Sequence, residues 1–348
     1  MKSALAALQA GVEELRWYIK SLRIEWELLA AATASPPCSD GDGIAAKLKA
    51  HTIGRAVAKR RFAYNSLIIS LYGLLEQYIE TLIRSYSSGL NSVVPRYAEM
   101  PDALKGTHVT LSFNLITKSE QSRYRGVVTP EALIANLHSC FSDQAAYRIN
   151  TDAFCLHTAN FRADVVDDLF SKVGIKGISQ RLHLFSPFPE HLQAIYPETD
   201  VASLKPEKKF FHLNDLAERR NEVAHGNVSE TLSYDIIEGY IDFIESYCMA
   251  LSELVQCHYY EYVARHTGTA LGKAIAVYNN TIVCLELRNV AVSVGDTLIA
   301  QTHNNDRPYL ASEIQELQVN RRAIQSIPAV DLVKIGAKVA FRCKKRFD

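Results

Sequence analysis

The sequence predicts a mainly α-helical chain that ends in a small all-β domain. Apolar residues recur at helical spacing in three long segments, and shorter helical segments lie between the second and the third. The long segments are residues 1–33, 45–86 and 231–266. After residue 266 the pattern changes to short runs rich in β-branched residues, separated by Asn-Asn and Gly-Asp turns. We therefore expect a helical domain over residues 1–266 and a β domain over residues 270–348.

Composition limits the class of protein. The 348 residues are 48% hydrophobic, which is enough for a substantial core. The formal net charge is zero, but the predicted β domain is mildly basic and the rest is mildly acidic, which suits an anionic partner at the β domain. The seven cysteines include no C-x-x-C pair, so we expect reduced thiols in a cytoplasmic protein.

Neither of the two most apolar segments has the features of a membrane segment. The N-terminal run contains Glu13 and Glu14, so it reads as an amphipathic helix and not as a signal peptide. The run over residues 66–83 is interrupted by Glu76 and Glu80, which indicates a buried helix of a protein that does not span a membrane.

The first two long helices are predicted from their apolar stripes. The stripe of residues 1–33 includes Leu5, Leu8, Val12, Leu15, Trp17, Tyr18 and Leu22. The stripe of residues 45–86 includes Phe62, Ile68, Ile69, Tyr72, Leu75, Ile79, Leu82 and Tyr86. Residues 88–128 are mixed, with a polar loop at residues 118–126. A new helix starts at Thr129-Pro130-Glu131, where an N-cap precedes a first-turn proline and an acid.

The later helices are separated by a Pro-rich segment. Residues 184–200 read as an irregular crossover because they contain three prolines. Lys205-Pro206 then opens a helix that ends at Gly226, a glycine expected just beyond the helix C-terminus. The last long helix carries Ile237, Tyr240, Ile244, Tyr247, Leu251, Leu254 and Tyr259 on its apolar side.

The segment "LAERRNEVAHGN" at residues 216–227 carries the clearest chemistry. RNA can be cleaved without a metal if one group takes the 2′-hydroxyl proton, another protonates the leaving oxygen, and a cation stabilises the phosphorane. His225 suits proton transfer, Arg220 suits phosphate, and Asn221 can orient either of them. No cofactor or metal is needed for this chemistry.

The spacing of these residues predicts a dimer. Asn221 and His225 are four residues apart and share a helix face, whereas Arg220 and His225 lie about 140° apart around an ideal helix. They converge only if the arginine sweeps across or the helix end unwinds. One His also supplies one proton group where cleavage needs two, and a two-fold dimer would bring two copies together.

An exposed helix C-terminus explains the same residues without a catalytic role, because the helix dipole favours Arg219 and Arg220 there and His225 can act as a cap.

The extended form Arg-Asn, then Ala-His-Gly, between two long amphipathic helices resembles the HEPN superfamily, whose signature is R-x4–6-H with a polar residue after the Arg. The resemblance covers roughly residues 50–262.

The resemblance implies a helical bundle that dimerises and places two motifs in one cleft. It also implies a metal-independent endoribonuclease that leaves a cyclic phosphate and a 5′-hydroxyl, often as a toxin or in antiviral defence. Arg220, Asn221 and His225 would then be catalytic, and Arg219 a supporting residue. Glu76 matches an acid in the first long helix of a subgroup, where it would support Arg220 or His225. A polar face that reaches solvent explains Glu76 equally well.

Two basic stretches are candidate RNA contacts. Lys208 and Lys209 lie about 18 Å along the helix from Arg220, so they would touch flanking RNA. Arg123, Tyr124 and Arg125 combine cations with a stacking ring in a predicted loop, which suits single-stranded RNA. Ordinary surface positions explain both stretches as well.

The β domain resembles the barrel that follows the GTPase domain in translational GTPases. The matching stretches are "VSVGDTL" at residues 292–298 and "VKIGAKV" at residues 333–339, although Gly336-Ala337 stands where Gly-Asp is frequent. No G-x4-G-K-[ST] motif occurs in the chain. The resemblance implies tRNA or ribosomal RNA as a target, and a barrel that only supports a dimer is the alternative.

The sequence therefore predicts a dimeric endoribonuclease with tRNA or rRNA as candidate substrate, restrained by an inhibitory or trigger partner. The alternative from another class is a non-catalytic RNA- or ribosome-binding module on the same fold. A scaffold without RNA affinity is the third hypothesis. No nucleophile elbow, dinucleotide fingerprint or metal-ligand spacing occurs in the chain.

Overall fold

A computed structural model describes residues 1–34, 47, 50–52, 54–142, 146–228 and 230–341. In chain order the helices are α1 (Lys2–Ala34), α3 (Ala56–Val93), η1 (Tyr97–Glu99), α4 (Asp102–Lys118), α5 (Pro130–Phe141), η2 (Thr151–Cys155), α6 (Ala163–Lys172), α7 (Ile178–Arg181), η3 (Leu182–Leu184), α8 (Phe188–Ile195), η4 (Val201–Ser203), α9 (Pro206–Lys209), α10 (Phe211–Ala224) and α11 (Tyr234–His266). The strands are β1 (Ala276–Tyr278), β2 (Ile282–Leu287), β3 (Val292–Ser293), β4 (Thr297–Gln301), β5 (Tyr309–Glu313), β6 (Glu316–Val319), β7 (Arg322–Ile324), β8 (Ser326–Ile327) and β9 (Val333–Lys338). The predicted fold class, mainly α followed by a small β domain, is confirmed.

The chain divides into two compact units. The first contains residues 1–87, 101–137 and 149–253, and the second contains residues 88–100, 138–148 and 254–348. The predicted division at residues 266 and 270 follows the change of secondary structure, whereas these units cut within α3 and α11.

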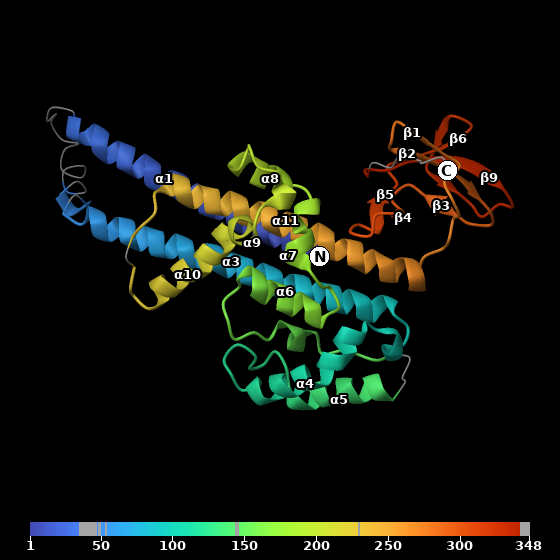
Figure 1. Ribbon diagram of the computed structural model, residues 1–348, viewed down its shortest axis with the longest axis horizontal. Coiled ribbons are helices and arrows are strands. Elements are labelled where there is room, and N and C mark those ends of the chain that lie inside the picture. The colour runs from blue at the N-terminus through green and yellow to red at the C-terminus, as the bar shows by residue number, and fades with distance from the viewer. Residues whose placement is uncertain (35–46, 48–49, 53, 143–145, 229, 342–348) are drawn as a thin grey trace. The chain divides into compact units, whose positions relative to one another are not determined.

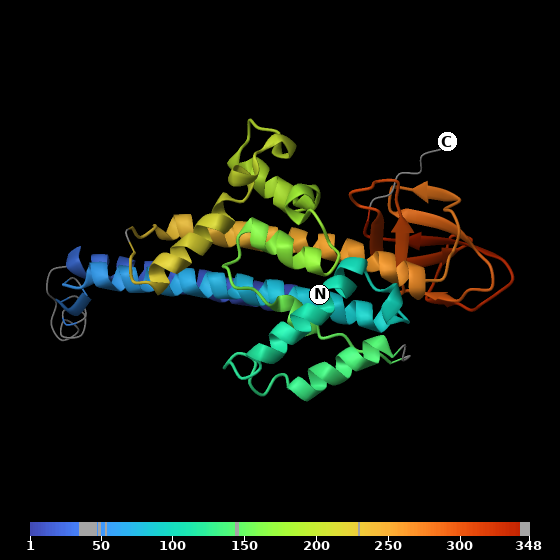
Figure 2. The ribbon, with the colours of Figure 1, turned by 60° about the horizontal axis from the view of Figure 1, so that its bottom comes forward.

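In the first unit, α1, α3 and α11 run side by side (Figures 1 and 2). The predicted apolar stripes mostly form this core, which includes Leu8, Val12, Ile19, Leu71, Leu75, Ile79, Ile241, Ile244 and Leu251. Trp17, Phe62 and Ile69, which the stripes had included, are exposed instead. Their helix faces point away from the packed neighbours, and helical spacing alone does not say how wide the covered face is.

Charged pairs line the α1–α11 contact. Arg16 of α1 donates to Asp242 at 2.6 Å and to Glu245 at 3.0 Å, both on α11. Two turns further along α1, Arg23 pairs with Asp235 at 2.6 Å and with Glu238 at 2.7 Å. Because higher numbers on α1 meet lower numbers on α11, the two helices are antiparallel.

Three sequence expectations change in the structure. The predicted helix from residue 45 is described as α3 only from Ala56, and residues 45–46, 48–49 and 53 lie outside the described residues. That helix extends to Val93, beyond the predicted end. The Pro-rich crossover contains the helix α8, because Pro189 falls in its first turn, where a missing N–H costs nothing.

Asn150 joins α4 and α5 from inside the first unit. Its side-chain amide donates to Ser112 Oγ at 2.9 Å and to the Leu133 carbonyl at 3.0 Å, and its oxygen accepts from Asn136 at 2.9 Å. Its backbone N–H donates to His108 Nε2 at 2.9 Å. Burial lowers the pKa of His108 to about 4, so this ring is a neutral acceptor near pH 7.

The second unit holds the strands. A five-stranded antiparallel sheet has the order β1-β2-β9-β6-β7, and two pairs, β3-β8 and β4-β5, accompany it. The stretch after Pro308 forms two strands, β5 and β6, which Ile314 and Gln315 separate, and Gly336 lies within β9.

The Gly-Asp turn of the β domain is well defined. Gly295 has φ 94°, a conformation that favours glycine, and its N–H donates to the Ile314 carbonyl at 2.9 Å. The Ile314 N–H donates back to the Asp296 carbonyl at 2.8 Å. The turn therefore fixes where β4 starts relative to the segment between β5 and β6.

Among the described residues, no helix is both long and apolar enough to cross a membrane.

Replacing Asn150 tests the α4–α5 connection. We expect Asn150→Ala to lower the free energy of unfolding by about 1–3 kcal/mol, because it leaves Ser112 and the Leu133 carbonyl buried without this donor. Urea unfolding followed by circular dichroism measures the change. Asn114→Ala, on the exposed face of α4, serves as the control and should change stability by no more than about 0.5 kcal/mol. Equal effects of the two variants would contradict the assignment.

Candidate functional site

The motif lies on α10, which is shorter than predicted. The expected helix from Pro206 breaks at Phe210, where φ is −112° and ψ is 21°. Phe210 is fully buried, and its ring stacks on Phe188 at 6.0 Å and meets Tyr247 at 6.3 Å. Aromatic packing of this residue therefore overrides helical continuation, and α10 starts anew at Phe211.

Arg220 lies over an aromatic ring of α3. Its guanidinium carbon is 5.4 Å from the centroid of the Tyr72 ring, which is buried. The Tyr72 hydroxyl accepts a hydrogen bond from the Phe161 N–H at 2.9 Å, which fixes the ring. A cation–π contact does not consume the N–H donors of a guanidinium, so these donors can still bind an anion.

Asn221 is fixed by a loop residue. The Asn160 side-chain amide donates to Asn221 Oδ1 at 2.5 Å and reaches the Ala217 carbonyl at 3.4 Å. Asn160 and Phe161 are consecutive, so the same short loop supports both Asn221 and the ring beneath Arg220. This loop connects η2 to α6.

His225 is exposed at a tightly wound helix end. Its N–H donates to the Asn221 carbonyl at 2.9 Å. Gly226 has φ 73°, its N–H reaches the Val223 carbonyl at 3.1 Å, and Asn227 reaches Glu222 at 2.9 Å. These bonds form a Schellman motif with Gly226 in the expected position. The helix end does not unwind, so His225 stays about 140° around the helix from Arg220.

Arg219 connects helices. Its guanidinium donates to Asp215 at 2.5 Å and to the Tyr64 hydroxyl of α3 at 3.2 Å. The Tyr240 hydroxyl of α11 also donates to Asp215, at 2.5 Å. Arg219 therefore holds α10 against α3 and α11, which is more than the dipole interaction of an exposed helix end.

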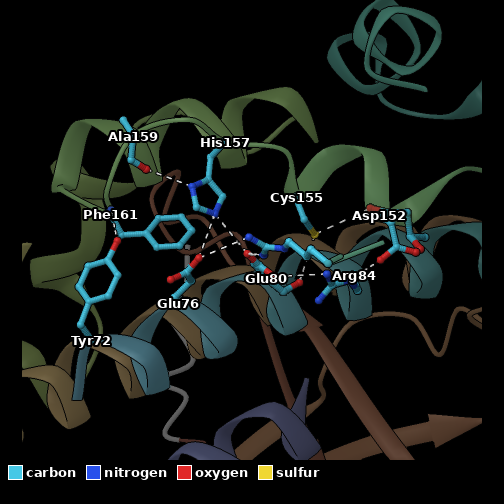
Figure 3. Close-up of polar contacts among 11 residues, drawn as sticks. Tyr72, Glu76, Glu80, Arg84, Asp152, Cys155, His157, Ala159 and Phe161 are labelled. Carbon is cyan, nitrogen blue, oxygen red and sulfur yellow. Dashed lines mark hydrogen bonds and ion pairs between the residues drawn. The ribbon is translucent and has the colours of Figure 1, made fainter. Parts of the chain in front are cut away.

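Glu76 belongs to a neighbouring charged cluster (Figure 3). The structure pairs it with His157 and Arg123, each at 3.5 Å, instead of with Arg220 or His225. Glu80, one turn further along α3, contacts His157 at 3.2 Å and also pairs with Arg123. Tyr72, Glu76 and Glu80 are spaced four residues apart, so the cluster continues the helix face that carries the ring under Arg220.

One further cation, Arg84, and one further acid, Asp152, complete the cluster. Arg84 contacts Glu80 at 3.3 Å and Asp152 at 2.6 Å. His157 also uses its other nitrogen, with Nδ1 3.0 Å from the Ala159 carbonyl (Figure 3). His157 could not be predicted from the sequence, because the stretch "LHTANF" has no recognisable motif and the acids that His157 contacts lie about 80 residues away in the chain.

The cluster shifts the pKa values of its members. Burial opposes the charge of His157, but hydrogen bonds to Glu76 and Glu80 outweigh it and raise the pKa to about 9. Burial would raise the pKa of Glu80, whereas its contacts with His157 and Arg123 lower it to about 2. The hydrogen bond from His157 lowers the pKa of Glu76. All three groups are therefore charged at neutral pH.

Among the described residues, Glu76, Glu80 and His157 could together hold a metal ion, because their ligand atoms lie within 4.8 Å of one another. The side chain of Arg123 already contacts both carboxylates, and His157 would have to lose its proton. A divalent cation would therefore compete with Arg123 and with the His157 proton. The donor set fits a self-neutralised ion cluster better than a metal site.

The five candidate RNA contacts have different surroundings. Lys208 is exposed, whereas Lys209 is buried and its amine donates to the Ala202 carbonyl at 3.2 Å. Tyr124 is buried in a small apolar cluster, so its ring is not free to stack on a base. Arg123 is paired with Glu80 as described above. Arg125 is exposed and donates to the Glu120 carbonyl at 2.8 Å.

The packed helices and the motif on α10 define the class of protein as a HEPN-type helical domain. The family model RiboL-PSP-HEPN matches residues 45–256, which is more than half of the chain, and the protein belongs to this family. HEPN domains act as nucleases or RNA-binding modules. Neither the curated proteins nor the solved structures contain a match to this chain.

The ion pairs of His157 make stability depend on pH. Because the folded pKa is about 9 and the unfolded value about 6.5, the stabilisation is complete below pH 6.5 and is lost as pH rises through 9. We expect His157→Asn to destabilise the protein more at pH 6 than at pH 10 in urea unfolding.

The double variant Glu80→Gln/His157→Asn gives the matched control. Compared with Glu80→Gln alone, the His157 substitution should cost less at pH 6 than it does in the wild type, because one of its two carboxylate partners is gone. A His157→Asn effect that is the same at both pH values would refute the ion-pair account.

Proposed function

We propose that the protein is a metal-independent endoribonuclease whose active site forms between two copies of the R-x4-H motif. The observation that carries this proposal is that other parts of the fold fix the positions of the motif residues on α10. Arg220 lies on a fixed ring, Asn221 is held by Asn160, and His225 is presented to solvent on a wound helix end. A surface helix end without a function needs none of these supports.

The reaction has few steps. The 2′-hydroxyl of a ribose attacks the adjacent phosphorus, and one His225 takes its proton. The P–O5′ bond breaks, a second imidazolium gives its proton to the leaving oxygen, and the products are a 2′,3′-cyclic phosphate and a 5′-hydroxyl. Arg220 binds the phosphate oxygens and stabilises the charge of the phosphorane. Asn221 orients the neighbouring groups from its position beside Arg220.

Two copies solve a geometric problem of one copy. Arg220 faces Tyr72, and His225 lies about 140° around the wound helix, so the two side chains of one chain diverge. A two-fold axis beside the end of α10 would bring one copy's His225 toward the other copy's motif and supply the second proton group. Arg219 supports this arrangement by holding α10 in place.

The remaining assignments concern recognition and control. Of the exposed candidate RNA contacts Lys208, Arg123 and Arg125, the proposal retains Lys208 and Arg125, because Arg123 is paired with Glu80. The β domain, whose sequence resembles the translation-factor barrel at the Gly-Asp turn, would bind tRNA or the ribosome. An RNase of this kind, acting as a toxin or in antiviral defence in the cytoplasm, requires an inhibitory or trigger partner to protect the cell.

A non-catalytic RNA-binding module is the second candidate. The observation that favours it is the same divergence of Arg220 and His225 within one copy. A chain that stays monomeric would keep an arginine for phosphate and would lack an assembled proton-transfer site. Cleavage therefore separates the two candidates, whereas RNA binding alone does not.

Cleavage with defined ends tests the catalytic proposal. Wild-type protein incubated with total tRNA and rRNA in EDTA should give cyclic-phosphate 3′ ends, and His225→Ala should reduce the rate by at least about 100-fold, since it removes the proton-transfer group. Sequencing after end-specific ligation identifies the ends. His138→Ala, another exposed histidine in a helix, is the control and should cleave normally. Intact RNA with bound wild-type protein would favour the binding module.

Dilution tests the two-copy site. If both copies contribute, the rate per chain should fall in proportion to concentration once the dimer dissociates, because the site is lost with the partner. Sedimentation of the same dilution series reports the dissociation. An excess of His225→Ala chains should also reduce wild-type cleavage by subunit exchange. A constant rate per chain across the dissociation range would disprove a shared site.

A further inference from the structure

A cavity of about 410 Å³ opens in the first unit. Its walls come from α4 and α6, and its floor from the loop that follows η2. Twelve residues line it, among them Asn114 on α4, Asp164 on α6, and His157 and Ala159 on the loop. The volume falls within the range that small-molecule pockets occupy.

The loop connects the cavity to the motif directly. Ala159 lines the cavity, and the next residue, Asn160, holds Asn221 by the 2.5 Å hydrogen bond. Consecutive Cα atoms are about 3.8 Å apart, so the cavity wall and the support of the motif are neighbours. Figure 3 shows Ala159 and His157 on this loop, with the His157 ring directed toward Glu76 and Glu80.

The lining carries charges of both signs. Asp164 and Asp168 on α6 are accompanied by Lys118, Lys172 and the charged His157, so the lining does not select a ligand by its net charge. The charged groups disfavour a purely apolar ligand. Leu111, Leu156, Val165 and Leu169 provide apolar surface between these groups. A flat neutral heterocycle with hydrogen-bond donors on its edge fits both features.

The two acids are not equivalent. Asp168 pairs with Lys172 at 2.6 Å, whereas Asp164 is an exposed residue in the first turn of α6. An ionised carboxylate only accepts hydrogen bonds, so Asp164 favours a base edge with an amino group, as in cytosine. Uracil lacks the amino group, and the two carbonyl oxygens beside its N–H would repel the carboxylate.

We propose that this cavity binds the base of a nucleotide that flanks the scissile phosphate, and that Asp164 selects bases with an amino group over uracil. The inference rests on RNA as the substrate in the proposed function. His157 holds the loop in place from beneath the cavity through Glu76 and Glu80. The selected base and the phosphate on Arg220 would then be held by two faces of the same loop.

Binding of short RNA measures the selection without cleavage. The full chain carrying His225→Ala is titrated into fluorescent hexamers of cytidine or uridine, and anisotropy gives the two affinities. We expect the cytidine hexamer to bind about tenfold more tightly, the size of one good base contact. Asp164→Asn in the same chain should abolish or reverse this preference, because an amide can also donate.

Asp102→Asn is the matched control, since Asp102 is likewise an exposed acid in the first turn of a helix. It should keep the tenfold preference. Filling the cavity gives an independent test, because Asn114 is exposed and lines the wall. Asn114→Trp should weaken both hexamers about tenfold or more, whereas Thr110→Trp, an exposed α4 position outside the lining, should not.

Each outcome of these binding and cleavage experiments supports or contradicts the proposed base-binding pocket. Equal affinities for the two hexamers, a preference that survives Asp164→Asn, or no binding at all would overturn the pocket. A preference that behaves as expected in a protein that never cleaves RNA would support the pocket and refute the catalytic proposal. Cleavage by the wild type with no base preference in either assay would do the reverse.

Discussion

The buried carboxylate of Glu80 is the constraint on which the site depends. A charge inside a helical bundle costs several kcal/mol unless it is paired, and Glu80 is only 5% exposed. Its partners are Arg84 on the same helix, Arg123 after α4, and His157 after η2. Segments that are distant in the chain are thereby fixed to one face of α3. The loop that begins at His157 acquires a defined position for this electrostatic reason.

The loop between η2 and α6 also fixes the positions of the motif residues. Three residues beyond His157, Asn160 holds Asn221, and Phe161 holds the hydroxyl of Tyr72 beneath Arg220. An ion cluster that takes no part in phosphate chemistry can therefore set the positions of groups that would. The same loop also lines the cavity between α4 and α6.

The end of α10 is stabilised by capping hydrogen bonds, but the same geometry keeps His225 away from Arg220. The Schellman hydrogen bonds at Gly226 satisfy the last carbonyls of the helix and hold His225 in helical geometry. That geometry separates His225 from Arg220 around the helix axis. A helix end that frayed would bring them closer but would give up the fixed position of Asn221. Assembly of two copies reconciles a rigid helix with a complete site, which is why we favour it.

The sequence by itself determined the fold class, the long helices, the end of the motif helix at Gly226 and the family that the R-x4-H motif resembles. Helical periodicity and helix-end signals are local, so they can be recognised without the tertiary structure. Tertiary structure alone decided which charges meet. Glu76 joined His157 instead of Arg220, Tyr124 became core, and the helix before α10 broke at Phe210. Each of these outcomes depends on burial and on partners far away in the chain. Local propensity carries no information about the cost of an unpaired buried charge or the gain of packing an aromatic ring.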